Sequence, residues 1–333
     1  MTQTSSAAST QPVSWILVGT GDIVHKRVGP ALAGRVHAVV GTHGRAEDLA
    51  KTLQAPHAFG KLDDALKNTR AEAVYIATPV HRHLNEALAA MAAGKHVLVE
   101  KPLALNHADA STLAAAVKPG QVAGCAYYRR FFPRFTHLKD TLGKGVLGKI
   151  VHVRMANWSW FNPAENDPKR WRTIPAQSGG GALSDVGVHM FDMLIDALGL
   201  PTRVFARCDN LVHSYQAEDS STVLMTLPNG AHVTATFGWN SKTWRHDLEV
   251  VGTEGKILWH PCDAGKVHVT VGREINEIDL PNHANVHQPL IDDFERAIRS
   301  NGAPACTFEQ AAQTNRLLDA IYRSAASGRE EQV

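Results

Sequence analysis

The hydrophobic and polar positions of this chain follow two patterns, which meet at about residue 125. Before that point, short runs of consecutive apolar residues alternate with segments in which apolar residues recur at helical spacing. Runs that are apolar at every position are typical of strands buried on both faces, and helices between them indicate a parallel sheet. We therefore predict a doubly wound parallel sheet. Its strands are expected at residues 15–18, 36–40, 73–77, 96–99 and 121–124, and its helices at residues 30–34, 46–53, 83–93 and 106–117.

Strand-like runs dominate the rest of the chain. Pro228, Asn229 and Gly230 separate two alternating runs, which is a strong signal for a hairpin, and residues 252–255 join two further runs. Strands are expected at residues 150–160, 204–212, 221–227, 231–237, 248–251, 256–259 and 267–271, and helices at residues 135–142, 186–198, 289–300 and 308–326. The expected fold class is α/β, with an N-terminal Rossmann domain and a C-terminal α/β domain that has a large open, mainly antiparallel sheet.

The length of 333 residues favours two domains, because one hydrophobic core seldom serves a chain of this size. We predict a disordered polar leader at residues 1–12, a dinucleotide-binding domain at residues 13–125 and a second domain at residues 126–333. The leader is rich in Ser, Thr, Ala and Gln and lacks the basic and apolar regions of a signal peptide.

Composition argues against several classes of partner. The formal net charge is +2 and there is no long basic run, so we expect no nucleic-acid binding. No uninterrupted apolar stretch approaches the length of a membrane span, so we expect no membrane insertion. Four widely spaced cysteines favour free thiols in a reducing compartment, and we expect a cytoplasmic protein. These cysteines are Cys125, Cys208, Cys262 and Cys306.

A glycine turn follows the first predicted strand. Gly19 allows a tight turn, and Gly21 lets the backbone approach a pyrophosphate at the amino end of the next helix. Val24 occupies the third glycine position, so the fingerprint is incomplete, and a plain strand–helix turn is the alternative. The candidate cofactor-binding residues here are Gly19, Thr20, Gly21, Asp22 and Ile23.

The end of the second predicted strand bears on the choice of cofactor. NAD sites usually carry an acidic residue there for the ribose hydroxyls. This chain has Thr42, His43 and Arg45, with no acid before Glu47. A hydroxyl and two potential cations can hold a 2′-phosphate, so we predict NADP in preference to NAD. Alternatively, Arg45 is a solvated residue at the start of a helix.

The tripeptide Glu100-Lys101-Pro102 ends another strand-like run. In open α/β sheets, ligands bind at the carboxyl ends of the strands. The bond before proline is also the one place where a cis peptide is inexpensive. Such a bond can turn the lysine ammonium into a cleft, although most lysines are solvated surface charges.

Several motifs then occur together in the order expected of one family. They are residues 77–79 with His83, 94–104, 127–131, 147–150, 179–189, 252–255 and 317–322. With the glycine turn, they resemble the glucose–fructose oxidoreductase / inositol dehydrogenase (Gfo/Idh/MocA) family over nearly the whole chain after the leader. The chain departs from the family pattern at Val24, Val80 and Tyr128.

This resemblance implies an NAD(P)-dependent oxidoreductase that transfers hydride to or from a sugar, an inositol-like polyol or a related keto-sugar. It implies that residues 126–333 bind the substrate and form a homodimer or homotetramer through the C-terminal sheet. It also implies cofactor contacts from Thr78, Pro79, His83, Glu100 and Lys101.

Asp185 and His189 are four residues apart in a predicted helical segment, so both side chains can lie on one face. The resemblance implies that they act with Lys101 as the catalytic group. His189 would handle the proton, Asp185 would orient substrate hydroxyls, and Lys101 would hold the reacting oxygen. The alternative is that Asp185 caps a helix and His189 is a core residue.

Residues 158–178 are a second candidate for contact with the substrate. Aromatic faces stack on sugars, and arginines bind hydroxyls or carboxylates, although the same residues can pack under a loop. The expected substrate-binding residues are Lys101, Tyr128, Arg129, Trp160, Arg170, Trp171, Arg172, Asp185 and His189. His81 with His83, and His283 with His287, have ligand-like spacing, but no set completes a metal site and none is expected.

Two other functions stay open at this point. A glycosidase that retains its nucleotide would release sugar without net oxidation. A regulator that senses nucleotide would keep the fold without the chemistry, although the intact Lys101, Asp185 and His189 argue against it.

Overall fold

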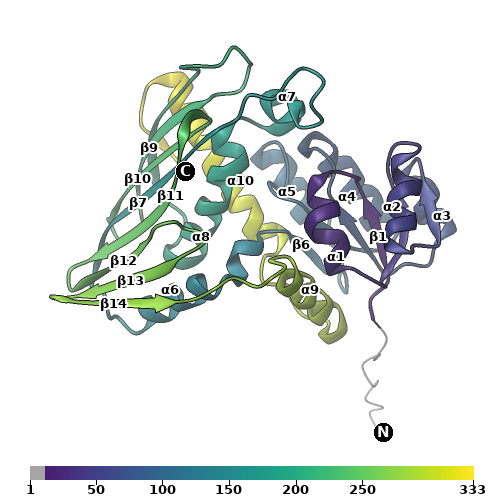
Figure 1. The fold of residues 1–333 in the computed structure, drawn as a ribbon, viewed down its shortest axis with the longest axis horizontal. Coiled ribbons are helices and arrows are strands. Elements are labelled where there is room, and N and C mark those ends of the chain that lie inside the picture. The colour runs from purple at the N-terminus through teal and green to yellow at the C-terminus, as the bar shows by residue number, and fades with distance from the viewer. Residues whose placement is uncertain (1–11) are drawn as a thin grey trace, which may run out of the picture.

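The computed structural model describes residues 12–333 and contains two sheets with helices between them. In Figure 1 the N-terminal sheet lies at one end of the molecule, and the larger sheet lies at the other end. Both predicted types of sheet are therefore present, and the expected α/β fold class is confirmed. The predicted leader lies almost wholly outside the described residues.

The N-terminal sheet is parallel throughout, with strand order β3-β2-β1-β4-β5-β6. Its strands are β1 (Trp15–Val18), β2 (Val36–Val40), β3 (His57–Phe59), β4 (Ala73–Ile76), β5 (His96–Val99) and β6 (Ala123–Cys125). Five of them were predicted. The strand that was missed, β3, lies at the sheet edge and is only partly buried, so it has no apolar run to reveal it.

Helices cover this sheet as the parallel pattern requires. They are η1 (Val24–Val28), α1 (Gly29–Ala31), α2 (Arg45–Leu53), α3 (Leu62–Asn68), η2 (Val80–Arg82), α4 (His83–Ala92) and α5 (His107–Ala115). The first helix was predicted at residues 30–34, but it starts earlier and ends at Ala31, and residues 32–34 form a turn. Helical backbone begins at Asp22, directly after the glycine turn, because Val24 and Val28 are buried one turn apart against the sheet.

The second sheet has nine strands in the order β14-β13-β12-β11-β7-β10-β9-β8-β15. All neighbours are antiparallel except β7 and β10, and both predicted turns join antiparallel strands. Its strands are β7 (Ile150–Trp160), β8 (Arg203–Asp209), β9 (Ser220–Thr226), β10 (His232–Gly238), β11 (Asn240–Gly252), β12 (Gly255–Trp259), β13 (Lys266–Val271), β14 (Glu274–Asp279) and β15 (Glu331–Gln332).

Two strand boundaries differ markedly from the prediction, and the edge strands β14 and β15 were not predicted. β8 stops at Asp209, because the amides of residues 211–213 donate to the carboxylate of Asp219 and leave the ladder. β11 begins at Asn240, well before residue 248, since polar residues extend it beyond its apolar run. β14 is an exposed polar edge strand that hydrophobicity does not reveal.

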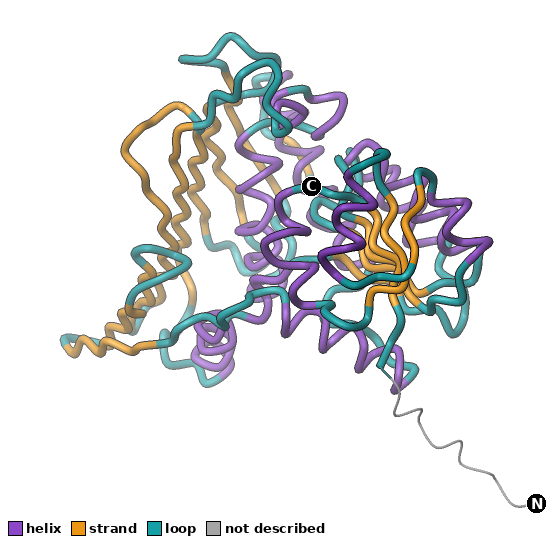
Figure 2. The backbone as a smooth tube through the Cα atoms, turned by 45° about the vertical axis from the view of Figure 1, so that its right-hand side comes forward, coloured by secondary structure: helices purple, strands orange, loops and turns teal. Residues whose placement is uncertain are grey.

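Helices cover one face of the second sheet and lie between it and the N-terminal domain (Figures 1 and 2). These helices are α6 (Pro133–Gly143), α8 (Val188–Leu198) and α10 (Phe308–Ser327). Shorter segments connect the elements: η3 (Tyr128–Phe131), η4 (Arg170–Thr173), α7 (Pro175–Ser178) and η5 (Leu183–Gly187). Along β9, Val223 and Met225 face the helices and are buried, whereas Leu224 is exposed on the opposite face.

α9 (Gln288–Ser300) returns to the N-terminal sheet, although its sequence position lies in the predicted second domain. Ile291 and Phe294 share a buried cluster with Trp15 of β1, and the indole nitrogen of Trp15 donates to Glu295 at 2.8 Å. The chain therefore returns from the second domain and packs against the first. The domain boundary at residues 125/126 stays a prediction.

Two further sequence expectations bear on compartment and membranes. All four cysteines are free, with three buried and Cys208 partly buried. Across residues 12–333, no helix combines the length and the apolar character that crossing a membrane requires.

A buried ion-pair network joins the end of the N-terminal sheet to α8. Arg130, in η3, donates to Asp192 through two nitrogens, with the shortest contact at 2.7 Å, and it also lies 3.1 Å from Asp196. Arg130 and Asp192 are almost fully buried. Breaking such a pair leaves a buried charge without compensation.

We expect Arg130→Met to lower the free energy of unfolding by about 3–5 kcal/mol, because Asp192 loses its counter-charge. Lys139→Met is the matched control, since Lys139 pairs with Asp196 at the exposed surface, and it should change stability by less than about 1 kcal/mol. Urea unfolding measures both. Equal effects in the two variants would contradict this account of the network.

Candidate functional site

The carboxyl ends of β2, β1, β4 and β5 meet at one edge of the parallel sheet. The strand order reverses between β1 and β4, because β2 and β3 extend to one side and β5 and β6 to the other. Ligands of open α/β sheets bind in the crevice outside such a switch point. The candidate site therefore starts at this edge.

The glycine turn lies at the crevice. Gly19 has φ of +113°, and a Cβ there would lie 2.5 Å from the carbonyl oxygen of Ala77, so only glycine fits between β1 and β4. A Cβ on Gly21 would meet no atom within 4 Å, so this backbone is open to an approaching group. The first amides of a helix have no intrahelical partner, and they attract phosphate. These residues fit the diphosphate of a dinucleotide.

Thr42, His43 and Arg45 follow β2 and are all exposed. The first acid, Glu47, accepts a hydrogen bond from the amide of Gly44 at 2.6 Å and lies 2.8 Å from Nδ1 of His43. The Glu47 carboxylate therefore already has two partners at the start of α2. The edge beside the glycine turn presents a hydroxyl and basic side chains.

Lys101 links the two halves of the molecule. The Lys101–Pro102 peptide is cis, as its sequence position allowed. The ammonium nitrogen donates to the carbonyl oxygen of Asp185 at 2.7 Å and to its carboxylate at 3.1 Å. The lysine predicted from the N-terminal sheet and the aspartate predicted from the second domain therefore lie in direct contact.

The charge of Asp185 is held by two cations. Nε of Arg172 lies 3.6 Å from the same carboxylate oxygen that Lys101 contacts. Burial acts to raise the pKa of Asp185, but Lys101 and Arg172 outweigh it and hold the pKa below its ordinary value. Asp185 is therefore a carboxylate at neutral pH.

His189 is buried in the first turn of α8, and its ring meets those of Tyr128 and Tyr127 edge-on. Its Nδ1 is buried and has no hydrogen-bond partner among residues 12–333. Burial, followed by the nearby charges of Lys101 and Arg129, places the pKa of His189 well below its usual value. The imidazole is therefore neutral at pH 7 and retains a nitrogen that accepts a proton.

The helix that carries Asp185 and His189 begins earlier than expected. It starts at Leu183 as a π-helical turn, η5, whereas sequence spacing placed its start at residue 186. The cause lies in Glu218, a buried residue that the sequence did not single out. Its carboxylate accepts from the amides of Gly181 and Leu183 at 2.7 and 3.1 Å, which satisfies the helix start.

Close packing explains the glycine triplet before this helix. A Cβ on Gly180 would lie 1.9 Å from the hydroxyl of Tyr322, and one on Gly181 would lie 2.0 Å from the carbonyl oxygen of Glu218. The Tyr322 hydroxyl also contacts Ser184 at 2.9 Å. The triplet therefore seats η5 on Glu218 and Tyr322, and these two residues fix the position of Asp185.

Only some of the expected substrate-binding residues reach Asp185. Arg172 does, and the ring of Trp171 stacks on its guanidinium at 4.8 Å. Arg170 instead donates to the carbonyl of Pro163 and is thus tied to its own loop. Trp160 is exposed and contacts His213 and Lys242, which belong to other segments.

Arg129 has internal partners. One nitrogen lies 3.2 Å from Nε2 of His246, and another donates to Asp263 at 2.8 Å. His246, Cys262 and Asp263 offer three potential metal ligands within 4.8 Å of one another. The guanidinium already compensates Asp263 and places positive charge beside His246, which disfavours a cation there. The expected absence of a metal stays a prediction.

Two predicted cofactor ligands in the crevice wall, His83 and Thr78, use their polar groups for hydrogen bonds within the protein. His83 is fully buried, with its ring nitrogens 2.9 and 3.0 Å from the carbonyl oxygens of Thr78 and Pro102. The Thr78 hydroxyl donates to Glu86 at 2.6 Å. We therefore expect His83 and Thr78 to shape the crevice and to leave direct contact with a cofactor to Pro79 and the glycine turn.

Glu100 is also buried and has partners that the sequence did not reveal. Its carboxylate accepts from the hydroxyl of Tyr75 at 2.8 Å and lies 3.5 Å from Nε2 of His287. His287 in turn stacks on Tyr128, with ring centroids 4.7 Å apart. His287 is adjacent to α9, so the return of that helix completes the wall of the site.

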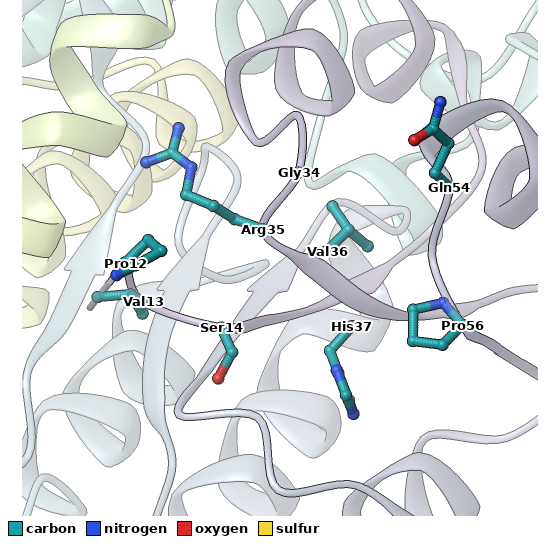
Figure 3. A pocket seen from close by; sticks show the side chains of 9 residues that line it. All are labelled: Pro12, Val13, Ser14, Gly34, Arg35, Val36, His37, Gln54 and Pro56. Carbon is teal, nitrogen blue, oxygen red and sulfur yellow. The ribbon is translucent and has the colours of Figure 1, made fainter.

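A hollow of about 360 Å³ lies away from this crevice. Figure 3 shows it between the chain segments before β1 and at the start of β2, with Ser14, Arg35 and His37 around it. These residues are at the amino ends of the strands, where open sheets do not place their active sites. The candidate site is therefore the crevice at the opposite edge.

We expect Gly181→Ala to lower the free energy of unfolding by about 1–3 kcal/mol, because the added methyl group collides with the backbone of Glu218. Gly143→Ala is the control, since nothing lies within 4 Å of its Cβ position. Thermal unfolding compares the two variants. A harmless Gly181→Ala would mean that close packing is not what requires the triplet.

Comparison with known proteins agrees with both halves of the structure. Residues 13–127 match the model of an oxidoreductase family with an NAD-binding Rossmann fold, and residues 135–258 match that of the GFO/IDH/MocA C-terminal domain. A solved levoglucosan dehydrogenase, in complex with NADH and levoglucosan, superposes with a TM-score of 0.89 over 97% of this chain and 100% of its own, at 22% identity.

Three relatives illustrate the family's range. Trans-1,2-dihydrobenzene-1,2-diol dehydrogenase of Oryctolagus cuniculus is 30% identical over 80% of this chain and 79% of its own. The 1,5-anhydro-D-fructose reductase of Ensifer adhaerens is 25% identical, covering 96% and 98%. D-xylose 1-dehydrogenase (NADP(+)) 2 of Haloferax volcanii is 27% identical, covering 94% and 97%. With both domain models matched, this chain belongs to the GFO/IDH/MocA family of NAD-binding oxidoreductases.

Proposed function

We propose that this chain is a dehydrogenase or reductase that transfers hydride between NADP(H) and a sugar, an inositol-like polyol or a keto-sugar. The observation that carries this proposal is the contact of Lys101 with Asp185 at the same sheet edge as the glycine turn, with the neutral His189 nearby. Two relatives, the 1,5-anhydro-D-fructose reductase and the D-xylose 1-dehydrogenase, support a sugar-like substrate.

The side chains suit the oxidation of a carbinol. A bound nicotinamide would supply the hydride chemistry. Lys101 donates a hydrogen bond to the reacting oxygen and stabilises the negative charge that develops there. His189, neutral because of its low pKa, accepts the hydroxyl proton, and Asp185 stays ionised and accepts hydrogen bonds from neighbouring substrate hydroxyls.

NADP is the cofactor that fits the end of β2. Thr42, His43 and Arg45 are exposed there and form the proposed site for the 2′-phosphate, while Glu47 is used at the helix start. The glycine turn would hold the diphosphate. Pro79 and the backbone around Glu100 would line the nicotinamide end of the crevice.

We propose that the chain forms a homodimer or homotetramer through the open face of the second sheet. Phe205 and Leu224 are paired on neighbouring strands of this face and are 38% and 50% exposed. Neighbouring apolar side chains that stay exposed on the uncovered face of a sheet are typical of an interface. The four free cysteines support a reducing compartment, for which we propose the cytoplasm.

The deciding experiment is a panel of aldoses, inositols and keto-sugars assayed with NAD and NADP by the absorbance of the reduced nicotinamide. We expect turnover of at least one of these substrates. Lys101→Met should reduce kcat about 100-fold or more, because a charged donor to the reacting oxygen is lost. Undiminished turnover in Lys101→Met would refute the assigned role. Sugar release from glycosides without net oxidation would favour the nucleotide-retaining glycosidase, and nucleotide binding with no turnover would favour the regulator.

Arg45→Ala should raise KM for NADP about tenfold or more and leave KM for NAD nearly unchanged, because only NADP has the 2′-phosphate. Lys51→Ala is the control, because Lys51 lies on the same helix near its other end. Steady-state kinetics with both cofactors test this prediction. A parallel loss with NAD and NADP would count against a 2′-phosphate site at Arg45.

A further inference from the structure

A lysine from the second domain lies against the glycine turn of the first. Nζ of Lys169, in the loop between β7 and η4, is 3.0 Å from the carboxylate of Asp22, which directly follows Gly21. Lys26, one helical turn further along the same helix, lies 3.4 Å from the same oxygen. The hydrogen bond from Lys169 is the main cause that lowers the pKa of Asp22.

Stability alone does not explain this contact. The side chains of Lys169 and Asp22 are 45% and 56% exposed, and exposed ion pairs contribute little to the free energy of unfolding. The position of the pair is more informative. A diphosphate at the glycine turn would bring negative charge next to the Asp22 carboxylate, and Lys169 is the cation that the other domain supplies at that place.

The same loop also reaches the catalytic carboxylate. Arg172, three residues after Lys169 and within the η4 turn, contacts Asp185. A short segment of the second domain therefore touches the proposed diphosphate site at one end and Asp185 at the other. A ligand that binds Lys169 would therefore also hold residues 169–172 against the crevice.

We propose that Lys169 is a binding residue for the diphosphate of the cofactor and that it exchanges the Asp22 carboxylate for the diphosphate when NADP(H) binds. This rests on the cofactor site of the proposed function. A lysine ammonium has three donors on a flexible four-carbon stem, so its side chain can turn from the Asp22 carboxylate to a neighbouring diphosphate. The second domain thereby contributes to cofactor binding as well as to substrate binding.

The test is calorimetric titration of the full chain with NADPH and, separately, with adenosine 2′-phosphate, which lacks the diphosphate. We expect Lys169→Met to weaken NADPH binding about three- to tenfold, because one charged hydrogen bond at a partly exposed site is lost. Binding of adenosine 2′-phosphate should stay unchanged, which also shows that the variant is folded. Unchanged binding of NADPH would overturn the proposal, whereas a wild-type chain that binds no NADPH would instead refute the proposed function.

A double-mutant cycle with Asp22→Asn separates direct contact from simple neutralisation of Asp22. If Lys169 binds the diphosphate, Lys169→Met weakens NADPH binding in the Asp22→Asn background as well. If Lys169 only neutralises Asp22, the loss disappears in that background and the proposal fails. Lys26→Met is the matched comparison, because Lys26 contacts the same carboxylate from within the helix, and we expect it to weaken binding less than Lys169→Met.

Discussion

The contact of Lys101 with Asp185 is the constraint on which the site depends. It spans the two domains, and each partner is held from its own side. Lys101 is placed by the carboxyl end of β5 and its cis peptide to Pro102. Asp185 is placed by the glycine triplet, which seats η5 on Glu218 and Tyr322. Neither domain alone brings Lys101 and Asp185 together, because each supplies only one of the two side chains.

This contact also sets the protonation of the site. Lys101 and Arg172 together lower the pKa of Asp185, and burial, assisted by Lys101, lowers that of His189. Lys101 thus favours both the charged carboxylate and the neutral imidazole. A carboxylate that accepts hydrogen bonds and an uncharged base that accepts a proton are what the oxidation of a hydroxyl requires. The return of α9, which brings His287 against Tyr128 and Glu100, closes the wall of this site.

Many of these features could be predicted from the sequence, because the patterns that reveal them depend on residues close together in the chain. Apolar runs separated by helices predicted five of six parallel strands, since strands covered on both faces need apolar residues throughout. The Gly19 turn and the Lys101–Pro102 peptide were found because glycine and proline limit the backbone directly. Exposed edge strands such as β3 and β14 escaped, because their residues are polar or half-buried and form no pattern.

The sequence by itself determined the two kinds of sheet, the turn that opens toward a phosphate and the identity of Lys101, Asp185 and His189 as candidates. Only the tertiary structure decided which side chains meet. It tied Arg129 to Asp263, turned His83 inward and brought Glu218, His287 and Lys169 to the site from distant segments. The physical reason is that periodicity and turn chemistry act over a few residues, whereas charge pairing and close packing depend on distances across the folded molecule.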